Sequence, residues 1–200
     1  MKEFLQSINL FYSVKDDFLE QVSSLCKTKT FPKSSMIILE EEYGDRLFIV
    51  KKGTVKITRV NDEGKEVILA LLGSGDFFGE MAILDGNSRS ANALAQEKCE
   101  LITINKEDFL ELLKNNFQIC MNLLEELAVR LRKSDQQIEA LSLSDAEHRI
   151  GVSILNLAED MGIIKNGEVT IESLPYQQDI ANMAGSSRET VSRVLKLFED

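Results

Sequence analysis

The spacing of hydrophobic positions changes twice along the chain and separates three stretches. Near the start, Phe18, Leu19, Val22 and Leu25 recur at helical spacing, which predicts helix from about residue 3 to residue 26. From residue 28 to about residue 104, short apolar runs alternate with turn residues, which indicates strands. These runs cover residues 36–39, 47–50, 55–60, 67–72 and 101–104. Many short strands at close spacing predict a small antiparallel barrel or jelly roll.

Helical spacing returns at residue 106 and continues to residue 141. Its second part has a heptad pattern, with steps of four and three that are typical of a helix that pairs with another helix. The positions are Cys120, Leu124, Leu127, Leu131, Ser134, Ile138 and Leu141. Two interpretations are open: the helix lies on its own barrel, or it pairs with a second copy of the chain. The polar flanks Arg130, Arg132 and Lys133 favour the homodimer.

The last third begins with a short hinge over residues 141–144. Asp145 is a suitable N-cap for a helix over about 145–161, because its side chain can accept from a free backbone N–H. Asn166-Gly167 predicts a hairpin turn. Residues 177–194 then have the spacing of a helix-turn-helix.

Each apolar or small position of this helix-turn-helix has a physical role. Ala181 allows two helices to cross closely, and Gly185 allows the positive φ of a tight turn. Ile180, Val191 and Val194 are expected to form the small core below the second helix. The pattern therefore predicts two short helices joined at Gly185.

The outward face of the second helix carries side chains suited to DNA. They are Arg188, Glu189, Ser192, Arg193 and Lys196. Arginine fits the edge of guanine and a carboxylate fits the amino group of cytosine, which favours base reading. The alternative is that Glu189 only forms a capping box with Ser186 and that the arginines are a solvated face.

Composition narrows the class of protein. The formal net charge of the 200 residues is −10, and residues 1–140 and 141–200 each contribute −5, from 18 basic against 23 acidic and 5 against 10. A nucleic-acid partner therefore requires a local basic patch. No apolar run is long enough to span a bilayer and no signal peptide is apparent, so we expect a cytoplasmic protein without a membrane partner.

The cysteine and histidine counts exclude several kinds of site. Cys26, Cys99 and Cys120 are scattered, which argues against a disulfide framework or a structural zinc site. A single histidine, His148, argues against a histidine-rich metal centre and a Ser–His–Asp triad. A cupin-like enzyme would use the same type of barrel, but the predicted barrel has no histidine. We therefore expect no enzyme, no metal and no prosthetic group.

The second distinctive motif is residues 78–91, Phe-Gly-Glu-Met-Ala-Ile-Leu-Asp-Gly-Asn-Ser-Arg-Ser-Ala. Arg89 followed by Ser90 is good chemistry for a phosphate. Glu80 beside Gly79 is placed to accept hydrogen bonds from a sugar hydroxyl. From the residues alone, a Glu80–Arg89 salt bridge across a turn is the simpler interpretation.

Together the two motifs resemble those of the Crp/Fnr family of transcription regulators. Residues 78–91 are similar to the phosphate-binding cassette of cyclic-nucleotide-binding domains, and residues 186–193 to the family's recognition helix. The order of barrel, long heptad helix, hinge and helix-turn-helix is also that of the family, over nearly the whole chain. The family's iron–sulfur sensors have an N-terminal cysteine cluster and its heme sensors a barrel histidine, and this sequence has neither.

The resemblance implies a role for each matching residue. Glu80 and Gly79 would hold the ribose, Arg89 and Ser90 the cyclic phosphate, and Arg130 would lie close to the glutamate. The implied ligand-binding set is Gly79, Glu80, Met81, Arg89, Ser90, Ala91, Arg130, Ser134 and Asp135. The effector would be cyclic AMP or another cyclic nucleotide. Asp135 departs from the family's hydroxyl pair at the adenine, so another phosphate-bearing ligand, or a pocket that has lost its ligand, stays open.

For DNA, the resemblance implies that Arg188, Glu189 and Arg193 read bases of a TGTGA-like palindrome. Ser186, Ser187 and Thr190 would contact phosphates, and Ser192 and Lys196 complete the DNA-binding set. Double-stranded DNA, a second copy of the chain and RNA polymerase are the implied partners.

The resulting expectation is an α+β chain of three parts. Residues 1–115 form an antiparallel β jelly roll with flanking helices, 116–141 a long dimerisation helix, and 142–200 a helix-turn-helix domain. The family continues into a β-wing after the recognition helix, and this sequence stops at Asp200, so the wing is expected to be missing.

Overall fold

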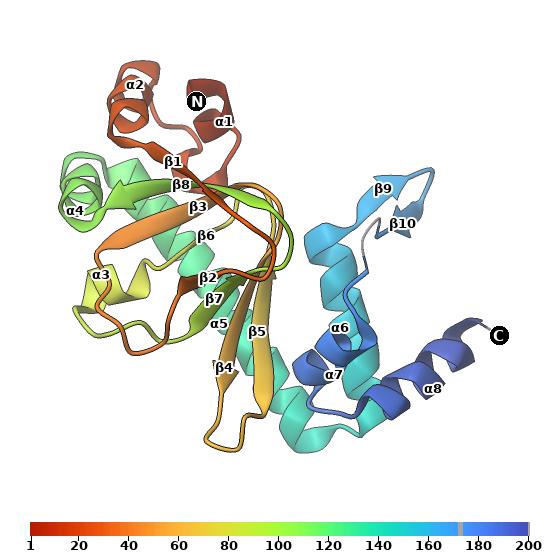
Figure 1. The fold of residues 1–200 in the computed structure, drawn as a ribbon. Coiled ribbons are helices and arrows are strands. Elements are labelled where there is room, and N and C mark those ends of the chain that lie inside the picture. Colours follow the sequence, from red (N-terminus) through yellow and green to blue (C-terminus); the bar gives the residue numbers. More distant parts are fainter. Residues whose placement is uncertain (172–173, 200) are drawn as a thin grey trace. The chain divides into compact units, whose positions relative to one another are not determined.

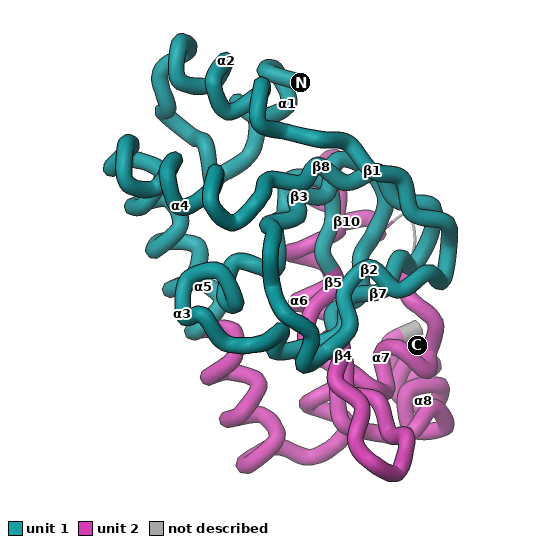
Figure 2. The backbone as a smooth tube through the Cα atoms, turned by 60° about the vertical axis from the view of Figure 1, so that its left-hand side comes forward, with its two compact units in different colours: residues 1–57, 72–131 teal, residues 58–71, 132–200 magenta. Residues whose placement is uncertain are grey.

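The computed structural model describes residues 1–171 and 174–199 and divides into two compact units. The first comprises residues 1–57 and 72–131, and the second comprises residues 58–71 and 132–200 (Figure 2). Antiparallel sheets, a long helix and a C-terminal helix-turn-helix follow one another along the chain (Figure 1). This confirms the predicted fold class.

The N-terminal stretch is helical in three short pieces rather than one. They are α1 (Lys2–Gln6), the 3₁₀ helix η1 (Asn9–Phe11) and α2 (Asp16–Leu25). The chain turns at Ser13, where φ is 60°. Leu10 and Phe11 are buried in the turn region, so burial of these side chains replaces the continuous helix that the spacing predicts.

Two four-stranded antiparallel sheets form the barrel, in the orders β1-β8-β3-β6 and β2-β7-β4-β5. The strands are β1 (Lys27–Phe31), β2 (Met36–Ile38), β3 (Arg46–Lys52), β4 (Val55–Val60), β5 (Glu66–Leu72), β6 (Phe77–Phe78), β7 (Asn92–Ala95) and β8 (Cys99–Asn105). All five predicted strands are present. In β3 the run Leu47–Val50 is almost fully buried, and β8 pairs with it along its length.

Three helices complete the first unit. The short α3 (Met81–Asp85) follows β6, α4 (Lys106–Asn115) follows β8, and α5 (Phe117–Leu143) continues into the second unit. Phe109 and Leu112 of α4 and Ile119 and Leu123 of α5 are buried in the core of the first unit. The expected break at residue 141 is wrong, because α5 continues to Leu143 and only Ser144 and Asp145 separate it from the next helix.

The second unit contains the helix-turn-helix. Besides parts of β4 and β5 and the end of α5, it contains α6 (Ala146–Met161), β9 (Ile163–Lys165), β10 (Glu168–Thr170), α7 (Gln177–Ala184) and α8 (Arg188–Glu199). The Asp145 carboxylate accepts from the His148 backbone N–H at 2.9 Å, as expected of an N-cap. Asn166 and Gly167, both with positive φ, form the predicted hairpin turn.

The core of this unit agrees with the helix-turn-helix prediction. Ile180, Ala181 and Val191 are fully buried, and Val194 is 1% exposed. Gly185 has φ 57°, in the left-handed region. A Cβ on Gly185 would lie 3.0 Å from Cδ2 of Leu141, so glycine serves both the turn and a close approach.

Candidate functional site

The cassette in the first unit is organised around two buried charged side chains, Glu80 and Arg89. Glu80 is 3% exposed and Arg89 is 6% exposed. Glu80 is the N-cap residue of α3, immediately after β6. Burying either charge without a partner would be costly, so their partners define the chemistry of the site.

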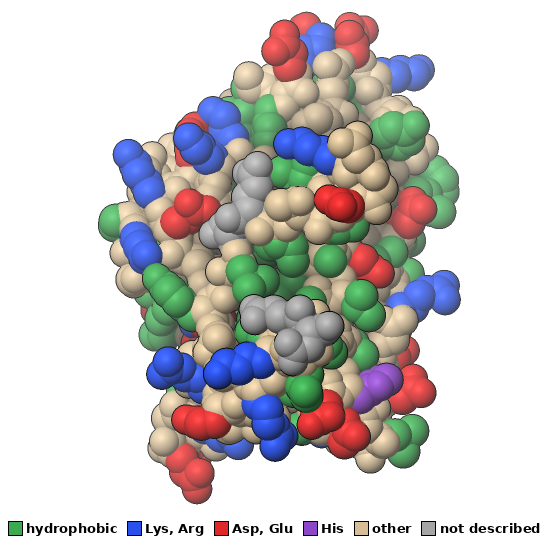
Figure 3. Space-filling model, turned by 90° about the vertical axis from the view of Figure 1, so that its right-hand side faces the viewer, with side chains coloured by type: hydrophobic (Ala, Val, Ile, Leu, Met, Phe, Trp, Pro, Cys, Tyr) green, Lys and Arg blue, Asp and Glu red, His purple; other side chains and the backbone are tan. Residues whose placement is uncertain are grey.

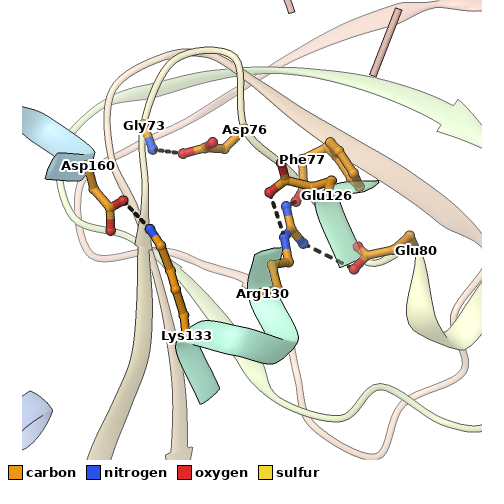
Figure 4. Close-up of polar contacts among 8 residues, drawn as sticks. All are labelled: Gly73, Asp76, Phe77, Glu80, Glu126, Arg130, Lys133 and Asp160. Carbon is orange, nitrogen blue, oxygen red and sulfur yellow. Dashed lines mark hydrogen bonds and ion pairs between the residues drawn. The ribbon is translucent and has the colours of Figure 1, made fainter. Parts of the chain in front are cut away.

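Glu80 is paired with Arg130 of α5 rather than with Arg89. Nη1 of Arg130 donates to Oε1 of Glu80 at 3.1 Å, and Nη2 donates to the Phe77 carbonyl at 2.7 Å (Figure 4). Nε of Arg130 donates to Glu126 at 3.0 Å, and the guanidinium lies 4.6 Å from the centre of the Phe77 ring. The Glu80–Arg89 salt bridge that the residues alone favoured is therefore wrong, and the Glu80–Arg130 proximity implied by the resemblance is present.

Burial governs the pKa of both charged groups. It raises the pKa of Glu80, and the Arg130 charge opposes this rise. Burial also lowers the pKa of Arg89, and the negative charges of Asp45 and Glu80 partly oppose this lowering. Glu80 thus stays charged less readily than an exposed glutamate, and Arg130 of the long helix is the cation that most strongly opposes the rise of its pKa.

The guanidinium of Arg89 donates to two backbone carbonyls. Nη1 donates to the Gly79 carbonyl at 2.7 Å and Nη2 to the Arg46 carbonyl at 2.8 Å. The guanidinium also lies 5.9 Å from the centre of the Phe48 ring. Gly79 has φ 84°, and a Cβ there would lie 2.6 Å from Nη1 of Arg89, so this position requires glycine.

Arg89 also lines a cavity of about 230 Å³ within the first unit. Its other walls include Phe48 and Arg46 of β3 and Tyr43 of the loop before it. Arg89 is bonded to neutral carbonyls, and the carboxylates of Glu42 and Asp45, which also line the cavity, offset part of its positive charge. The guanidinium of Arg89 is the group of this cavity that suits a phosphate, because its fork of N–H donors matches phosphate oxygens.

The remaining cassette residues are more exposed. Met81 and Ser90 are exposed and 3.8 Å apart (Ser90 Oγ to Met81 Sδ), and Ala91 is half-buried. Ser134 and Asp135 lie on the part of α5 that belongs to the second unit, and both are exposed. The sequence did not single out Phe77 or Phe48, because each acts through a contact between distant segments. It also did not single out Glu126, which pairs with Arg130 one turn away on the same helix.

The recognition helix α8 presents the predicted polar side chains. Arg188, Glu189, Arg193 and Lys196 are exposed, and Thr190 and Ser192 are half-buried. Figure 3 shows acidic and basic side chains interspersed on the face that it draws. Nη2 of Arg193 lies 3.6 Å from Oε1 of Glu147 in α6, and both side chains are mostly exposed.

The cap of α8 differs from the predicted capping box. Ser187, not Ser186, is the capping residue, since its Oγ accepts from the Thr190 backbone N–H at 3.2 Å. The Ser186 backbone N–H is used in the turn, where it donates to the Ala181 carbonyl. The pKa of Glu189 is lowered by its own backbone N–H and by the Ser187 hydroxyl.

The residues of the predicted heptad pattern form an apolar stripe on the long helix, and they differ in how exposed they are. Leu124, Leu131, Ile138 and Leu141 are 59%, 63%, 62% and 55% exposed. Ser134 is also exposed. Cys120 is half-buried, with its Sγ 3.0 Å from the Leu113 carbonyl, and Leu127 packs against the core of the first unit.

Two further polar contacts lie near the long helix and the turn before β6. Lys133 of α5 pairs with Asp160 of α6, and Asp76 accepts from the Gly73 N–H in the turn before β6 (Figure 4). Across residues 1–171 and 174–199, no helix is long and apolar enough to cross a membrane. In the same described part of the chain, no three or more His, Cys, Asp and Glu side chains are grouped to hold a metal.

A cyclic-nucleotide-type cassette joined by a long helix to a helix-turn-helix defines a DNA-binding regulator with a ligand domain. Residues 28–116 match the cyclic nucleotide-binding domain, and residues 148–200 match the Crp-like helix-turn-helix domain. The chain belongs to the CRP/FNR family of transcription regulators.

Relatives are similar over most of the chain. The cyclic AMP receptor protein of Thermus thermophilus is 34% identical over 93% of this chain and 83% of its own length. The cAMP-activated global transcriptional regulator CRP of Pasteurella multocida is 36% identical over 92% of this chain and 88% of its own. The crystal structure of the Thermus thermophilus catabolite activator protein has a TM-score of 0.62 at 33% identity, and covers 96% of this chain and 86% of that one. These relatives are transcription regulators, not enzymes.

Proposed function

We propose that this chain is a dimeric regulator whose DNA binding is controlled by a cyclic nucleotide in the barrel. The observation that carries the proposal is the cassette, in which buried Glu80 meets Arg130 from the long helix while the guanidinium of Arg89 is held by the Gly79 and Arg46 carbonyls. A ligand that touches Glu80 therefore acts directly on a partner of the dimerisation helix. Cyclic AMP is the first candidate, because relatives at 34–36% identity are named for it.

Each end of such a ligand has a chemical counterpart. The Arg89 guanidinium and the Ser90 hydroxyl suit the cyclic phosphate, since a fork of N–H donors matches two phosphate oxygens. The Glu80 carboxylate suits the ribose 2′-hydroxyl, with Gly79, Met81 and Ala91 forming the surrounding backbone. Ser134 and Asp135 are proposed to meet the base, Ser134 as a hydroxyl donor or acceptor.

The alternative is a regulator whose barrel has lost its nucleotide and responds to another signal. Asp135 motivates it, because a carboxylate brings negative charge to the position proposed for the base. Calorimetry on nucleotide-stripped protein with cyclic AMP, cyclic GMP and cyclic di-GMP decides between them. Saturable binding of one of these supports the proposal, and no binding of any at millimolar concentration establishes the alternative.

The chain would act in the cytoplasm, on double-stranded DNA and with RNA polymerase. We propose that residues 1–115 sense the ligand, 116–141 join two copies, and 142–200 bind DNA. Arg188, Glu189 and Arg193 would read bases, with Ser186, Ser187, Thr190, Ser192 and Lys196 holding the backbone. The exposed recognition helix supports this assignment.

The partner of the long helix is proposed to be a second copy of this chain. The apolar stripe has heptad spacing and polar flanks, which suits a symmetric helix pair. We propose Leu124, Leu131, Ser134, Ile138 and Leu141 as its centre. Cys120 and Leu127 would lie at its edge, since they also contact the chain's own barrel.

Leu131→Glu is expected to give monomers that bind DNA weakly. The substitution would bury an unpaired carboxylate at the proposed helix pair. The free energy of burying this charge would exceed the free energy gained from the remaining helix contacts. Val129→Glu is the matched control, because Val129 is also exposed on α5 but lies off the stripe. Sedimentation should show dimers for the wild type and Val129→Glu. A wild-type monomer at micromolar concentration, with and without ligand, would refute the helix pair.

Ligand affinity is expected to fall as the pH is lowered from neutral toward the ordinary range of glutamate. Burial raises the pKa of Glu80, so this carboxylate takes up a proton before exposed glutamates do and loses its charge toward the ligand hydroxyl. Glu80→Gln should bind cyclic nucleotide more weakly and with little pH dependence. Glu126→Gln, which removes the other carboxylate on Arg130, should keep the pH dependence; calorimetry across this range checks both variants.

A further inference from the structure

One arginine of the second unit, Arg149, joins two chain segments that are far apart in the sequence. Nε of Arg149 donates to the Ala184 carbonyl at 2.8 Å, and Nη2 donates to the Gly185 carbonyl at 3.2 Å. Nη1 donates to the Ser144 carbonyl at 2.8 Å. The side chain is half-buried, at the fourth position of α6.

The three acceptors lie where two helices end. Ser144 is the first residue after α5, Ala184 is the last residue of α7, and Gly185 is the left-handed residue that follows it. Carbonyls at helix C-termini lack intrahelical partners and lie at the negative end of the helix dipole. A guanidinium satisfies them well because its donors point in several fixed directions.

A second contact connects the same two segments. Leu141 in the last turn of α5 lies against the turn, since a Cβ on Gly185 would be 3.0 Å from its Cδ2. The recognition helix begins just beyond this turn: Ser187 caps it, and the Val191 N–H donates to the Ser187 carbonyl. The end of the long helix is therefore connected, through both Arg149 and Leu141, to the turn that precedes the recognition helix.

We propose that Arg149 is the positioning residue that couples the end of the long helix to the recognition helix. This rests on the proposed function, because it is ligand in the barrel that would move the long helix. Because the planar guanidinium of Arg149 binds all three carbonyls, a shift of the Ser144 carbonyl would also displace the carbonyls of Ala184 and Gly185. Lysine keeps the charge but has one ammonium group, which cannot hold three carbonyls in these directions.

The test compares Arg149→Lys with Arg132→Lys, the same change at an exposed position of α5. For each protein, affinity for a duplex carrying the palindromic site is measured without and with saturating cyclic AMP, cyclic GMP or cyclic di-GMP. Coupled sites typically change affinity by about 5- to 150-fold. We expect this ligand-induced gain to fall at least about fivefold in Arg149→Lys and to be unchanged in Arg132→Lys, while ligand affinity of both stays near that of the wild type.

The outcomes separate coupling from simple stabilisation. An unchanged ligand-induced gain in Arg149→Lys, including an equal loss of DNA affinity with and without ligand, would show a structural cap and overturn the proposal. If Arg149→Lys does not fold, Leu141→Ala, checked as a dimer by sedimentation, must lower the gain instead or the proposal is wrong. If the ligand does not increase the DNA affinity of the wild type, both ligand control and the coupling are refuted. If the ligand increases the DNA affinity of the wild type and of the variants equally, only the role of Arg149 is refuted.

Discussion

Arg193→Ala is expected to weaken binding to a TGTGA-like palindrome by about 1–3 kcal/mol at each half-site and to relax the preference at one base pair. The expected loss is large because the proposed dimer would read the site twice, and because alanine cannot replace a bidentate arginine–guanine contact. Arg193 is exposed on α8, so its removal should leave the core of the second unit intact. Fluorescence anisotropy on the cognate site and on single-base variants measures both effects.

Lys196→Ala is the control for the loss of one positive charge on the same helix. Lys196 is also exposed, and its expected role is toward phosphates. This variant should weaken all sequences alike and flatten the dependence on salt. A selection from random DNA that yields no TGTGA-like palindrome would contradict the base assignment even if DNA binding itself is tight.

Arg89→Ala is expected to lower the affinity for a cyclic nucleotide at least about tenfold. A hydrogen bond to a charged group contributes about 1.5–3 kcal/mol, and about 1.4 kcal/mol corresponds to a factor of ten. The variant should also melt at a lower temperature, because the Gly79 and Arg46 carbonyls lose their donor. Calorimetry and thermal unfolding measure the two effects separately.

Two further variants separate the effect of the paired N–H donors of Arg89 from the effect of its positive charge. Arg89→Lys keeps the charge near the phosphate but not the paired donors, so its affinity should lie between those of the wild type and Arg89→Ala. Lys114→Ala removes an exposed charge at the end of α4, away from the cassette, and should bind as the wild type does. Wild-type affinity in Arg89→Ala would refute the assignment of the phosphate site.

The fold was predictable wherever a local pattern carries it. Apolar runs identified β3, β4 and β5, and the spacing around Ala181 and Gly185 identified the helix-turn-helix, because burial imposes a period on the sequence. β1 was missed because Lys27–Phe31 alternates lysine and threonine, and four of its five residues are exposed. β6 has only two residues, too few to show a period.

The site was predictable in its residues but not in its pairing. The spacing from Glu80 to Arg89 suggested that these two pair, whereas the structure pairs Glu80 with Arg130, fifty positions away. Only the resemblance to a family indicated that proximity. Neighbouring serines also look alike in a sequence, so the cap of α8 was placed at Ser186 instead of Ser187. Arg149 gave no signal, since its acceptors are backbone carbonyls that every residue possesses.

The ion pair between Glu147 and Arg193 has a consequence for how fast the protein searches along DNA. At 3.6 Å and with both side chains mostly exposed, such a pair contributes about 0–1 kcal/mol. Under the proposed base-reading role, Arg193 would stay with Glu147 on unrelated sequence while other side chains follow the phosphates, which would let the protein slide. At a guanine in the correct position, the stronger bidentate contact would replace the pair and lengthen the residence time. Glu147→Gln should therefore slow the search by prolonging stops at wrong sites, which single-molecule tracking on long DNA can measure.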